Sequence, residues 1–373
     1  MNAQWQPLLE ALIDPRSLLA RSEADWDLLL RQAYAAGLLG RLAHGVVQLG
    51  AAESLPRPVW HAMQAMLTLV EQQQRAVRWE LVQLQRLLAE LPGPVLILKG
   101  AAYCAAELPP AAGRLFADID LLLPRERLAE AEAALMLGGW VSEPKTDYDQ
   151  RYYRRWMHEL PPMTQVARGT ALDLHHRLLP LTARIQTPPE PLFECAVPLA
   201  DFPRLQRPQD LDLILHSACH WFHEGEWVHG LRDLADLDLL LRDALARRGE
   251  AMWTQLLERA AQLNLGRPLW FALFHARDLL RCPVPDAALA DCPARPGRLH
   301  AAWMNALLRR GFSCAHAGSR LPGSAPAAFL LYLRGHYLRM PPQLLLPHLV
   351  VKAWMRWQDA RKARTEEQAP TAG

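Results

Sequence analysis

The sequence predicts an α+β protein in which a mixed sheet core is flanked by helical regions on both sides along the chain. Three observations predict this fold class. Residues 1–92 carry apolar side chains at helical spacing. Short, fully apolar runs bounded by proline and glycine, typical of buried strands, follow in residues 93–208. From Gln209 onward the helical spacing returns.

Composition narrows the class of protein further. The chain has 373 residues, of which 51% are hydrophobic and 21% are charged, which excludes a disordered chain. The 41 basic and 39 acidic residues give a net charge of +2, which excludes nucleic-acid binding through bulk charge. Six cysteines without a C-x-x-C pair indicate free thiols of a reducing compartment. No signal peptide or bilayer-spanning stretch is recognisable, so we expect a cytoplasmic protein.

Residues 1–92 are expected to form a helical N-terminal region. One helix is predicted over Trp26–Leu49, and a longer one follows the prolines at positions 56 and 58. In the longer helix, steps of three, four and seven residues place these side chains on one face: Val70, Val77, Leu81, Leu84, Leu88 and Leu91. About three heptads are too few to predict a coiled coil, so we interpret this face as packing on the rest of the protein.

Residues 93–208 are predicted to hold the α/β core. Four strands are expected there: Val95–Leu98, Ile119–Leu123, Tyr148–Met157 and Thr170–His175. A helix is expected from Gly100, and another over Arg125–Leu137, which Pro124 precedes and two glycines end. The proline-rich stretch Pro180–Pro208 is expected to be a connection that includes one or two short strands.

Residues 209–364 are predicted to form a helical C-terminal region, and residues 365–373 a flexible tail. The expected helices are Asp210–His223, Glu226–Arg247, Met252–Leu263, Pro268–Leu280, Leu299–Arg310, Ala327–Leu338 and Gln343–Arg364. The last of these mixes tryptophans with basic residues. We expect it to pack through its tryptophans, and weak contact with a membrane surface or with a polynucleotide is the alternative.

The residues that carry chemistry are Asp118 and Asp120, at the start of a predicted strand. Residues i and i+2 of a strand point to the same face, so the two carboxylates emerge side by side. Their charge needs compensation, and hard carboxylate oxygens favour Mg²⁺ or Mn²⁺ over zinc. If the strand of Asp173 pairs with this one, three carboxylates converge, as a two-metal phosphoryl-transfer site requires. His175 is expected to be a structural histidine or a partner of Asp173.

Residues before this strand are suited to bind a phosphate group. Lys99 and Gly100 stand where a buried strand turns into a helix. Glycine lets a phosphate approach the backbone, and the start of a helix offers free N–H groups. Lys99 adds a positive charge, and Arg114 has two interpretations: it binds phosphate or pairs with the carboxylates. The alternative for Lys99 is also a solvated or ion-paired side chain.

These motifs together resemble a known family. The segments LKGAAY, GRLFADIDLLL and ALDLHHRL are similar to those of the bacterial uncharacterised nucleotidyltransferase family, in the DNA polymerase β-type nucleotidyltransferase superfamily. The resemblance covers about Val95 to Leu241 and implies a nucleotidyltransferase-like core. It also implies an enzyme that binds a nucleoside triphosphate with Mg²⁺ and transfers the nucleoside monophosphate to an acceptor. The acceptor class stays open among a small molecule, a sugar phosphate, a protein and an RNA end.

The resemblance assigns roles to single residues. Asp118 and Asp120 match the metal-binding pair, Asp173 matches the third carboxylate, and Gly100 matches the phosphate-contacting glycine. The chain has Ala101 where the superfamily usually has serine or glycine. The missing serine hydroxyl favours the alternative function, a catalytically inactive nucleotide sensor or scaffold on the same fold. A sugar-nucleotide glycosyltransferase that uses the Asp118–Asp120 pair is a third, less favoured alternative.

A helix after the core offers one more candidate. Three histidines at helical spacing, His216, His220 and His223, would suit zinc, but we favour a polar helix face near the cleft. Asp236, like its acidic neighbours in the next helix, is expected to pair within that helix.

Overall fold

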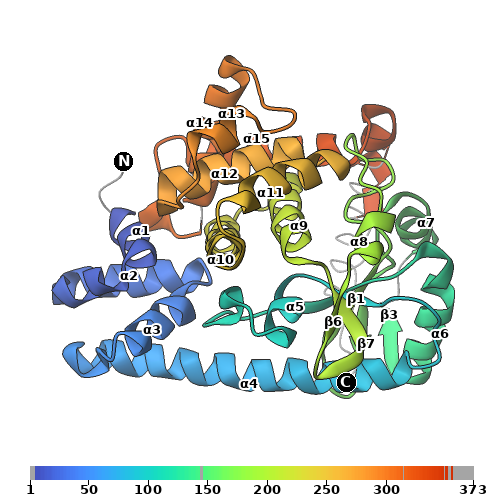
Figure 1. Ribbon diagram of the computed structural model, residues 1–373, viewed down its shortest axis with the longest axis horizontal. Helices are drawn as coiled ribbons and strands as arrows, with labels where there is room; N and C mark the ends of the chain where they lie inside the picture. The colour runs from blue at the N-terminus through green and yellow to red at the C-terminus, as the bar shows by residue number, and fades with distance from the viewer. Residues whose placement is uncertain (1–4, 143–145, 314, 348, 352–353, 356–373) are drawn as a thin grey trace, which may run out of the picture.

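The computed structural model describes residues 5–142, 146–313, 315–347, 349–351 and 354–355. Within these residues seven strands form one mixed sheet in the order β3-β4-β5-β2-β1-β7-β6. The strands are β1 (Leu96–Ile97), β2 (Asp118–Leu122), β3 (Trp140–Ser142), β4 (Met163–Gln165), β5 (Ala171–His175), β6 (Val197–Leu199) and β7 (Phe202–Arg207). β2 runs parallel to β5 and antiparallel to β1. The predicted α+β class, with helices before and after the sheet, is confirmed (Figure 1).

The N-terminal region is helical, as predicted. Its helices are α1 (Gln6–Ile13), α2 (Glu23–Ala35), α3 (Leu39–Gln48) and α4 (Arg57–Leu87), with short 3₁₀ helices at Pro15–Ala20 and Ala52–Ser54. The single helix expected over Trp26–Leu49 is two helices. Gly37 has a φ of 68° between them, a left-handed conformation that ends α2 and turns the chain into α3.

Helix α4 runs along one side of the molecule (Figure 1) and packs on α3, α5 and β7. The predicted apolar face is buried at Val70, Val77, Leu81 and Leu84. This face therefore packs on the rest of the protein, as predicted.

Polar side chains of α4 hold two loops of the core. The amide of Gln73 pairs with both backbone groups of Phe116: its Oε1 accepts from the N–H at 2.7 Å, and its Nε2 donates to the carbonyl at 2.5 Å. Two turns later the buried Glu80 accepts hydrogen bonds from Arg168 and from the Thr170 hydroxyl. These contacts fix the chain just before β2 and just before β5.

The helices of the middle region are α5 (Lys99–Ala105), α6 (Leu128–Leu137), α7 (Asp147–Trp156) and α8 (Glu190–Glu194), with 3₁₀ helices at Pro109–Ala111 and Arg125–Arg127. The strand expected over Tyr148–Met157 is wrong, because this segment is α7. The Thr146 hydroxyl accepts from the Asp149 N–H at 3.2 Å and caps the helix. The aromatic residues that suggest a strand instead meet one turn apart, with the Tyr152 and Trp156 rings 6.1 Å apart.

The connection Pro180–Pro208 contains the two short strands that were expected in it. β6 and β7 form an antiparallel pair, and β7 joins the sheet by pairing in parallel with β1. The strand expected over Val95–Leu98 is shorter in the structure: Leu96 and Ile97 pair with β2, and Leu96 also pairs with β7. The strands β3 and β4 were not anticipated, and they extend the sheet beyond β5.

The C-terminal region is helical, as predicted. Its helices are α9 (Asp210–His223), α10 (Gly230–Arg248), α11 (Ala251–Gln262), α12 (Gly266–Leu280), α13 (Asp286–Ala290), α14 (Arg298–Phe312) and α15 (Ser324–Arg339), with a 3₁₀ helix at Ala317–Ser319. Helix α10 begins four residues later than expected, because Glu224 binds the N–H groups of Gly225 and Glu226 in a turn. A helix was expected over Gln343–Arg364, and the described residues 343–347, 349–351 and 354–355 are helical. The rest of this segment and the tail from residue 365 lie outside the described residues.

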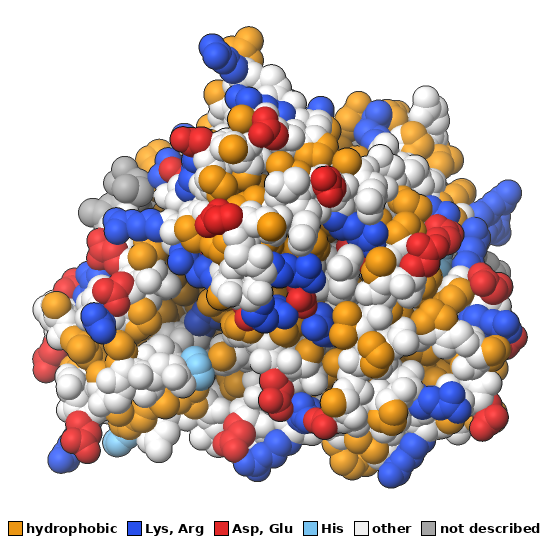
Figure 2. Space-filling view, viewed as in Figure 1, with side chains coloured by type: hydrophobic (Ala, Val, Ile, Leu, Met, Phe, Trp, Pro, Cys, Tyr) orange, Lys and Arg blue, Asp and Glu red, His pale blue; other side chains and the backbone are white. Residues whose placement is uncertain are grey.

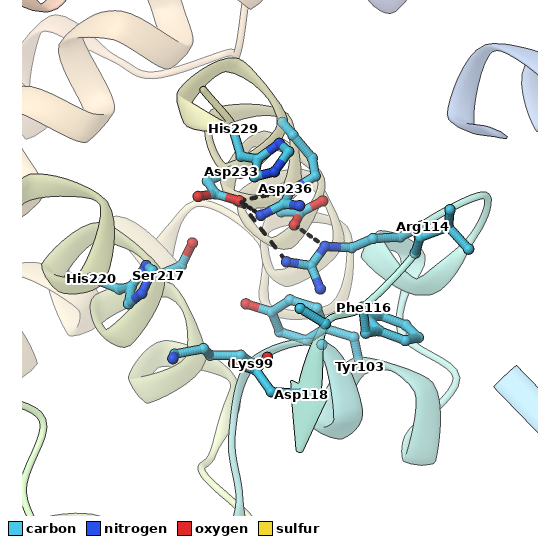
Figure 3. A pocket seen from close by; sticks show the side chains of 14 residues that line it. Lys99, Tyr103, Arg114, Phe116, Asp118, Ser217, His220, His229, Asp233 and Asp236 are labelled. Atoms are coloured by element: carbon cyan, nitrogen blue, oxygen red, sulfur yellow. Dashed lines mark hydrogen bonds and ion pairs between the residues drawn. The ribbon is translucent and has the colours of Figure 1, made fainter. Parts of the chain in front are cut away.

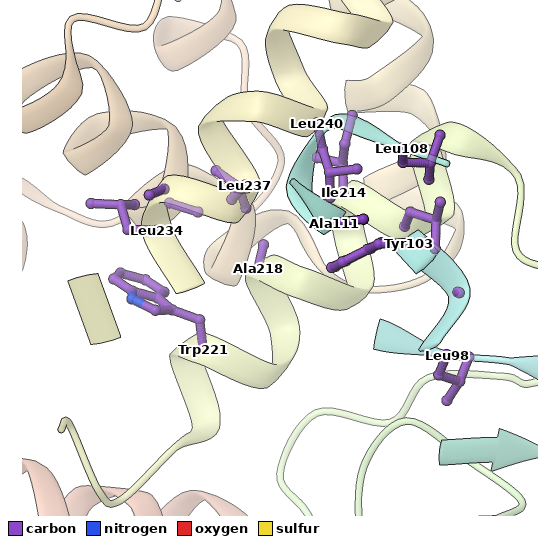
Figure 4. Close-up of a cluster of buried hydrophobic side chains, with 14 of the residues drawn as sticks. Leu98, Tyr103, Leu108, Ala111, Ile214, Ala218, Trp221, Leu234, Leu237 and Leu240 are labelled. Atoms are coloured by element: carbon purple, nitrogen blue, oxygen red, sulfur yellow. The ribbon is translucent and has the colours of Figure 1, made fainter. Parts of the chain in front are cut away.

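Apolar packing joins the core to the C-terminal helices. Figure 4 shows Tyr103 of α5, and Leu108 shortly after this helix, beside Ile214 of α9 and Leu240 of α10. These residues are buried, so burial of their apolar surface stabilises the contact between the sheet side and the helices. The packing holds α9 and α10 near the start of β2.

The surface carries charges of both signs. Figure 2 shows Lys and Arg side chains interspersed with Asp and Glu over the visible face, in keeping with the net charge of +2. Among the described helices, none combines the length and the apolar character that crossing a membrane requires.

Candidate functional site

Two neighbouring parallel strands bring the predicted carboxylates together. The register of β2 and β5 sets Asp120 opposite Asp173, and Asp118 opposite Ala171. Asp118 and Asp120 are two residues apart and therefore share one face of β2. Ligand atoms of Asp120, Asp173 and His175 all lie within 4.8 Å of one another. The expected strand pairing is confirmed, and it brings Asp120 and Asp173 together, whereas neither group of potential metal ligands among the described residues includes Asp118.

Asp120 is the best-connected of these carboxylates. It is 1% exposed, and its Oδ1 accepts from the Lys99 ammonium at 2.7 Å. The same oxygen lies 2.9 Å from Nε2 of His175. Lys99 is thus ion-paired, which was one of its two expected states. His175, expected to be a structural histidine or a partner of Asp173, contacts Asp120. Two potential cations compensate the charge of this buried group.

The three carboxyl groups have different proton affinities. Burial would raise the pKa of Asp120, but Lys99 and His175 hold it well below its usual range. Burial, followed by the charge of Asp120, raises the pKa of Asp118. Burial, with Glu159 and Asp120 nearby, raises the pKa of Asp173 to about 7. The site therefore combines one firmly ionised carboxylate with two that gain protons more readily.

Glu159 is a further acidic residue of the site that the sequence did not indicate. It forms an isolated antiparallel bridge with His175, which places its carboxylate 3.5 Å from Nδ1 of that histidine. His158, Glu159 and His175 form a second group whose ligand atoms lie within 4.8 Å of one another. His175 thus lies between two carboxylates, and its pKa is raised although burial alone would lower it.

The turn between β1 and α5 has an unusual backbone at Lys99. Its φ is 48°, a left-handed conformation that costs a non-glycine residue about 1–2 kcal/mol. Gly100 follows, and a Cβ there would lie 2.3 Å from a terminal nitrogen of Arg114 and 2.2 Å from the Phe116 ring. Glycine at this position therefore admits the Arg114 guanidinium. Ala101 is buried inside α5.

A cavity of about 200 Å³, which we call the central cavity, opens beside these residues. Its polar lining comes from α5, from the segment before β2, from α9 and from α10: Lys99, Tyr103, Arg114, Asp118, Ser217, His220, His229, Arg232, Asp233 and Asp236. Figure 3 shows Lys99 and Asp118 on one side, and the α10 residues facing them across the space. The central cavity therefore joins the carboxylate strand to three cationic side chains.

Arg114 is positioned by helix α10. Its Nε lies 2.6 Å from Asp236, and a terminal nitrogen lies 3.9 Å from Asp233 (Figure 3). Asp236 also accepts from Arg41 of α3 at 2.6 Å. The expectation that Asp236 pairs within its own helix is wrong, because this buried carboxylate instead joins α3 and the loop of Arg114 to α10. Arg114 is ion-paired, though not with the strand carboxylates.

Helix α9 contributes neutral polar groups. Ser217 also lines the central cavity. It lies outside the three sequence segments that carry the family resemblance, so the sequence did not indicate it. His220 lines the cavity too, and burial lowers its pKa to about 4. His216 and His223 are buried, and His223 Nδ1 lies 2.8 Å from the Cys219 carbonyl. In the described residues, neither potential metal group includes these histidines.

Two more cavities border the segment that leads into β2. One, of about 330 Å³, lies between the N-terminal helices and Phe116, with Tyr34 and Met66 in its wall. The other, of about 200 Å³, lies between α4 and the starts of β2 and β5, beside Arg168. Space for ligand groups is thus present on both sides of Asp118.

The proton affinity of Asp173 has a measurable consequence. A carboxyl group with a raised pKa in the folded protein stabilises it at low pH, and that contribution is lost as the pH rises through the folded pKa. For Asp173 the window runs from about 4, the usual unfolded value, to about 7. We expect Asp173→Asn to stabilise the metal-free protein above pH 7 by about 1–3 kcal/mol, less than the full shift implies because the group is partly solvated.

Urea unfolding at pH 4.5 and pH 8 with chelator present measures this effect. The gain of Asp173→Asn over the wild type should be near zero at the lower pH and largest at the higher one. Asp201→Asn, which removes an exposed carboxylate paired with Arg78, serves as the control and should show no such trend. A constant difference at both pH values would contradict the assigned proton affinity.

Comparison with known proteins gives one match. The model of a family described as uncharacterised nucleotidyltransferase matches residues 22–281, a range that includes every residue of the site described above. The searches of curated proteins and of solved structures returned no match to the chain.

Proposed function

Because this chain belongs to the uncharacterised nucleotidyltransferase family, we propose that it transfers a nucleoside monophosphate from a nucleoside triphosphate to an acceptor. Asp118, Asp120 and Asp173 would hold the divalent cations of a two-metal, three-carboxylate mechanism. The observation that carries this proposal is the parallel register of β2 and β5, which sets Asp120 beside Asp173 with Asp118 on the same face.

The donor set fits a divalent cation. Ligand atoms of Asp120, Asp173 and His175 lie within 4.8 Å of one another, and oxygen donors dominate the group, which favours Mg²⁺ or Mn²⁺. A cation bound there would neutralise charge on the triphosphate and lower the pKa of the attacking hydroxyl.

The cations of the central cavity suit the triphosphate. Lys99, Arg114 and Arg232 line it, and each offers N–H donors to phosphate oxygens. Ser217 supplies a hydroxyl in the same cavity, a group that the Gly100–Ala101 turn does not offer. The apolar cavity beside Phe116 provides room for the base.

Asp173 is suited to accept a proton in the reaction. The acceptor hydroxyl oxygen attacks the α-phosphorus, and the bond from this phosphorus to the oxygen bridging to the β-phosphate breaks. Pyrophosphate leaves, and the hydroxyl proton passes to Asp173, a carboxylate beside Asp120 that can act as a general base.

Labelled nucleotides test the proposal. The protein, Mg²⁺ and host extract are incubated with triphosphates labelled at the α- or the γ-phosphate, with Asp173→Asn in parallel and Asp201→Asn as the control. Transfer of α-label to an acceptor by the wild type and the control, but not by Asp173→Asn, is expected. Transfer of γ-label would replace the proposal with phosphoryl transfer. Metal-dependent binding without transfer would favour the sensor, and absence of both would reject the site.

A further inference from the structure

A further cavity, which we call the arginine cavity, lies among helices α12, α14 and α15. These helices form the upper part of Figure 1. The volume of the cavity is about 720 Å³, within the range of about 300–1,000 Å³ that is usual for small-molecule sites. It shares no lining residue with the central cavity. Its role is therefore separate from that of the carboxylate strands.

Three arginines line this cavity: Arg184, Arg267 and Arg334. Its lining contains no carboxylate among the described residues. Within the part of the chain that the structure describes, none of the three forms an ion pair. By contrast, Arg114 and Arg232 of the central cavity each form an ion pair with an aspartate. Among the described residues, the positive charge of the arginine cavity thus has no carboxylate counter-ion in its lining.

Arg334 is a half-buried arginine of this cavity. Its guanidinium lies 3.9 Å over the Phe222 ring, and a terminal nitrogen donates to the Phe222 carbonyl at 2.7 Å. Burial lowers the pKa of Arg334 to about 9. Charges removed from water are normally paired, so an anion beside Arg334 would stabilise the folded protein.

The other two arginines surround the same space. Arg184 stacks 3.8 Å over the Tyr337 ring and donates from Nε to the Tyr337 carbonyl at 3.2 Å. These contacts fix the plane of its guanidinium at the wall of the cavity. Arg267 stands at the start of α12 with an exposed side chain. Cations are therefore held at both the inner and the outer part of the cavity.

The remaining wall is largely apolar and aromatic, with Asn264 and His300 as further polar side chains. Trp303 and Met304 of α14 face Leu333 of α15 across the cavity. Trp303 is 53% exposed and Leu333 is 43% exposed, although both belong to large side-chain types that proteins tend to cover. An occupant must therefore offer an apolar body as well as negative charge.

We propose that the arginine cavity binds a small amphipathic anion, with an apolar or aromatic body and one terminal phosphate or carboxylate group. The anionic group lies between Arg334 and Arg267, and the body covers Trp303, Met304 and Leu333. The proposal is independent of the chemistry at the central cavity.

Fluorescence of 1-anilinonaphthalene-8-sulfonate, an aromatic anion, tests the proposal on the full chain. We expect saturable binding that dodecyl phosphate or dodecanoate displaces at least about tenfold better than the uncharged dodecanol, because only an anion meets the guanidinium groups. A stronger effect of dodecyl phosphate would identify a phosphate ester as the natural class, and a stronger effect of dodecanoate would identify a carboxylate.

Two variants locate the binding. Arg334→Met keeps an unbranched side chain over Phe222 and removes the charge. Arg267→Gln removes the charge of an exposed residue, and this substitution should leave the fold intact. Each variant should weaken probe binding by at least about tenfold. Arg277→Gln is the control and should not weaken binding, because Arg277 lies on α12 like Arg267 but is paired with Asp286. Equal displacement by dodecanol, or unchanged binding in both cavity variants, would overturn the proposal.

Discussion

Asp118→Asn is expected to lower the rate of nucleotide transfer about 10³-fold or more, which corresponds to about 4 kcal/mol of transition-state stabilisation. Asp118 lies on the edge of the central cavity and on the same strand face as Asp120. Asparagine keeps the shape of the side chain but removes the charge that a divalent cation requires. Affinity for Mg²⁺ in the presence of nucleotide should fall as well.

Stability separates this loss from simple unfolding. Burial and the charge of Asp120 raise the pKa of Asp118, so neutralising Asp118 removes a repulsion in the metal-free protein. We therefore expect Asp118→Asn to unfold at the same urea concentration as the wild type or at a higher one. The measurements are the initial rate of α-label transfer and calorimetric titration with Mg²⁺, with Asp201→Asn as the matched control. A variant that retains more than about a tenth of the rate would remove Asp118 from the metal site.

Asp236→Asn is expected to lower the free energy of unfolding by about 3–5 kcal/mol, the usual effect of removing one partner from a buried ion pair. Asp236 is 2% exposed and contacts both Arg41 and Arg114 at 2.6 Å. Its neutralisation leaves two largely buried guanidinium groups without their carboxylate. It also releases the side chain that places Arg114 beside Gly100.

Urea unfolding measures this loss, and Asp243→Asn is the matched control. Asp243 lies on the same helix and pairs with Arg247 at the surface, so its replacement should change the free energy of unfolding by less than about 0.5 kcal/mol. Combining Asp236→Asn with Arg114→Met should recover part of the stability, because one unpaired cation is then gone. Equal effects of the two asparagine variants would show that Asp236 does not connect the three segments.

The local part of the site could be predicted from the sequence. Asp118 and Asp120 stand two residues apart in an apolar run, and a strand has only one way to orient such a pair. The pairing of this strand with that of Asp173 was only a condition for the site in the sequence, and the register of β2 and β5 meets it. The turn at Lys99 and Gly100 was recognisable because a strand period gives way there to a helical one.

The distant part of the site could not be predicted. Asp236 lies 195 residues from Arg41 along the chain, and helical spacing reveals the face of a side chain but not its partner. Glu159 reaches His175 through a single bridge in a segment without regular pattern. The tyrosines of the segment that forms α7 favour strands, whereas the Thr146 cap and contacts one turn apart make it a helix.

Helix α4 also sets a constraint on changes of chain length. Gln73 and Glu80 are seven residues apart, close to two full turns, so both reach the sheet from one side of the helix. Deleting or inserting one residue between them would rotate one contact by about 100° relative to the other. Either the loop before β2 or the loop before β5 would then lose its anchor. Natural relatives should therefore tolerate substitutions in this interval far more readily than gaps.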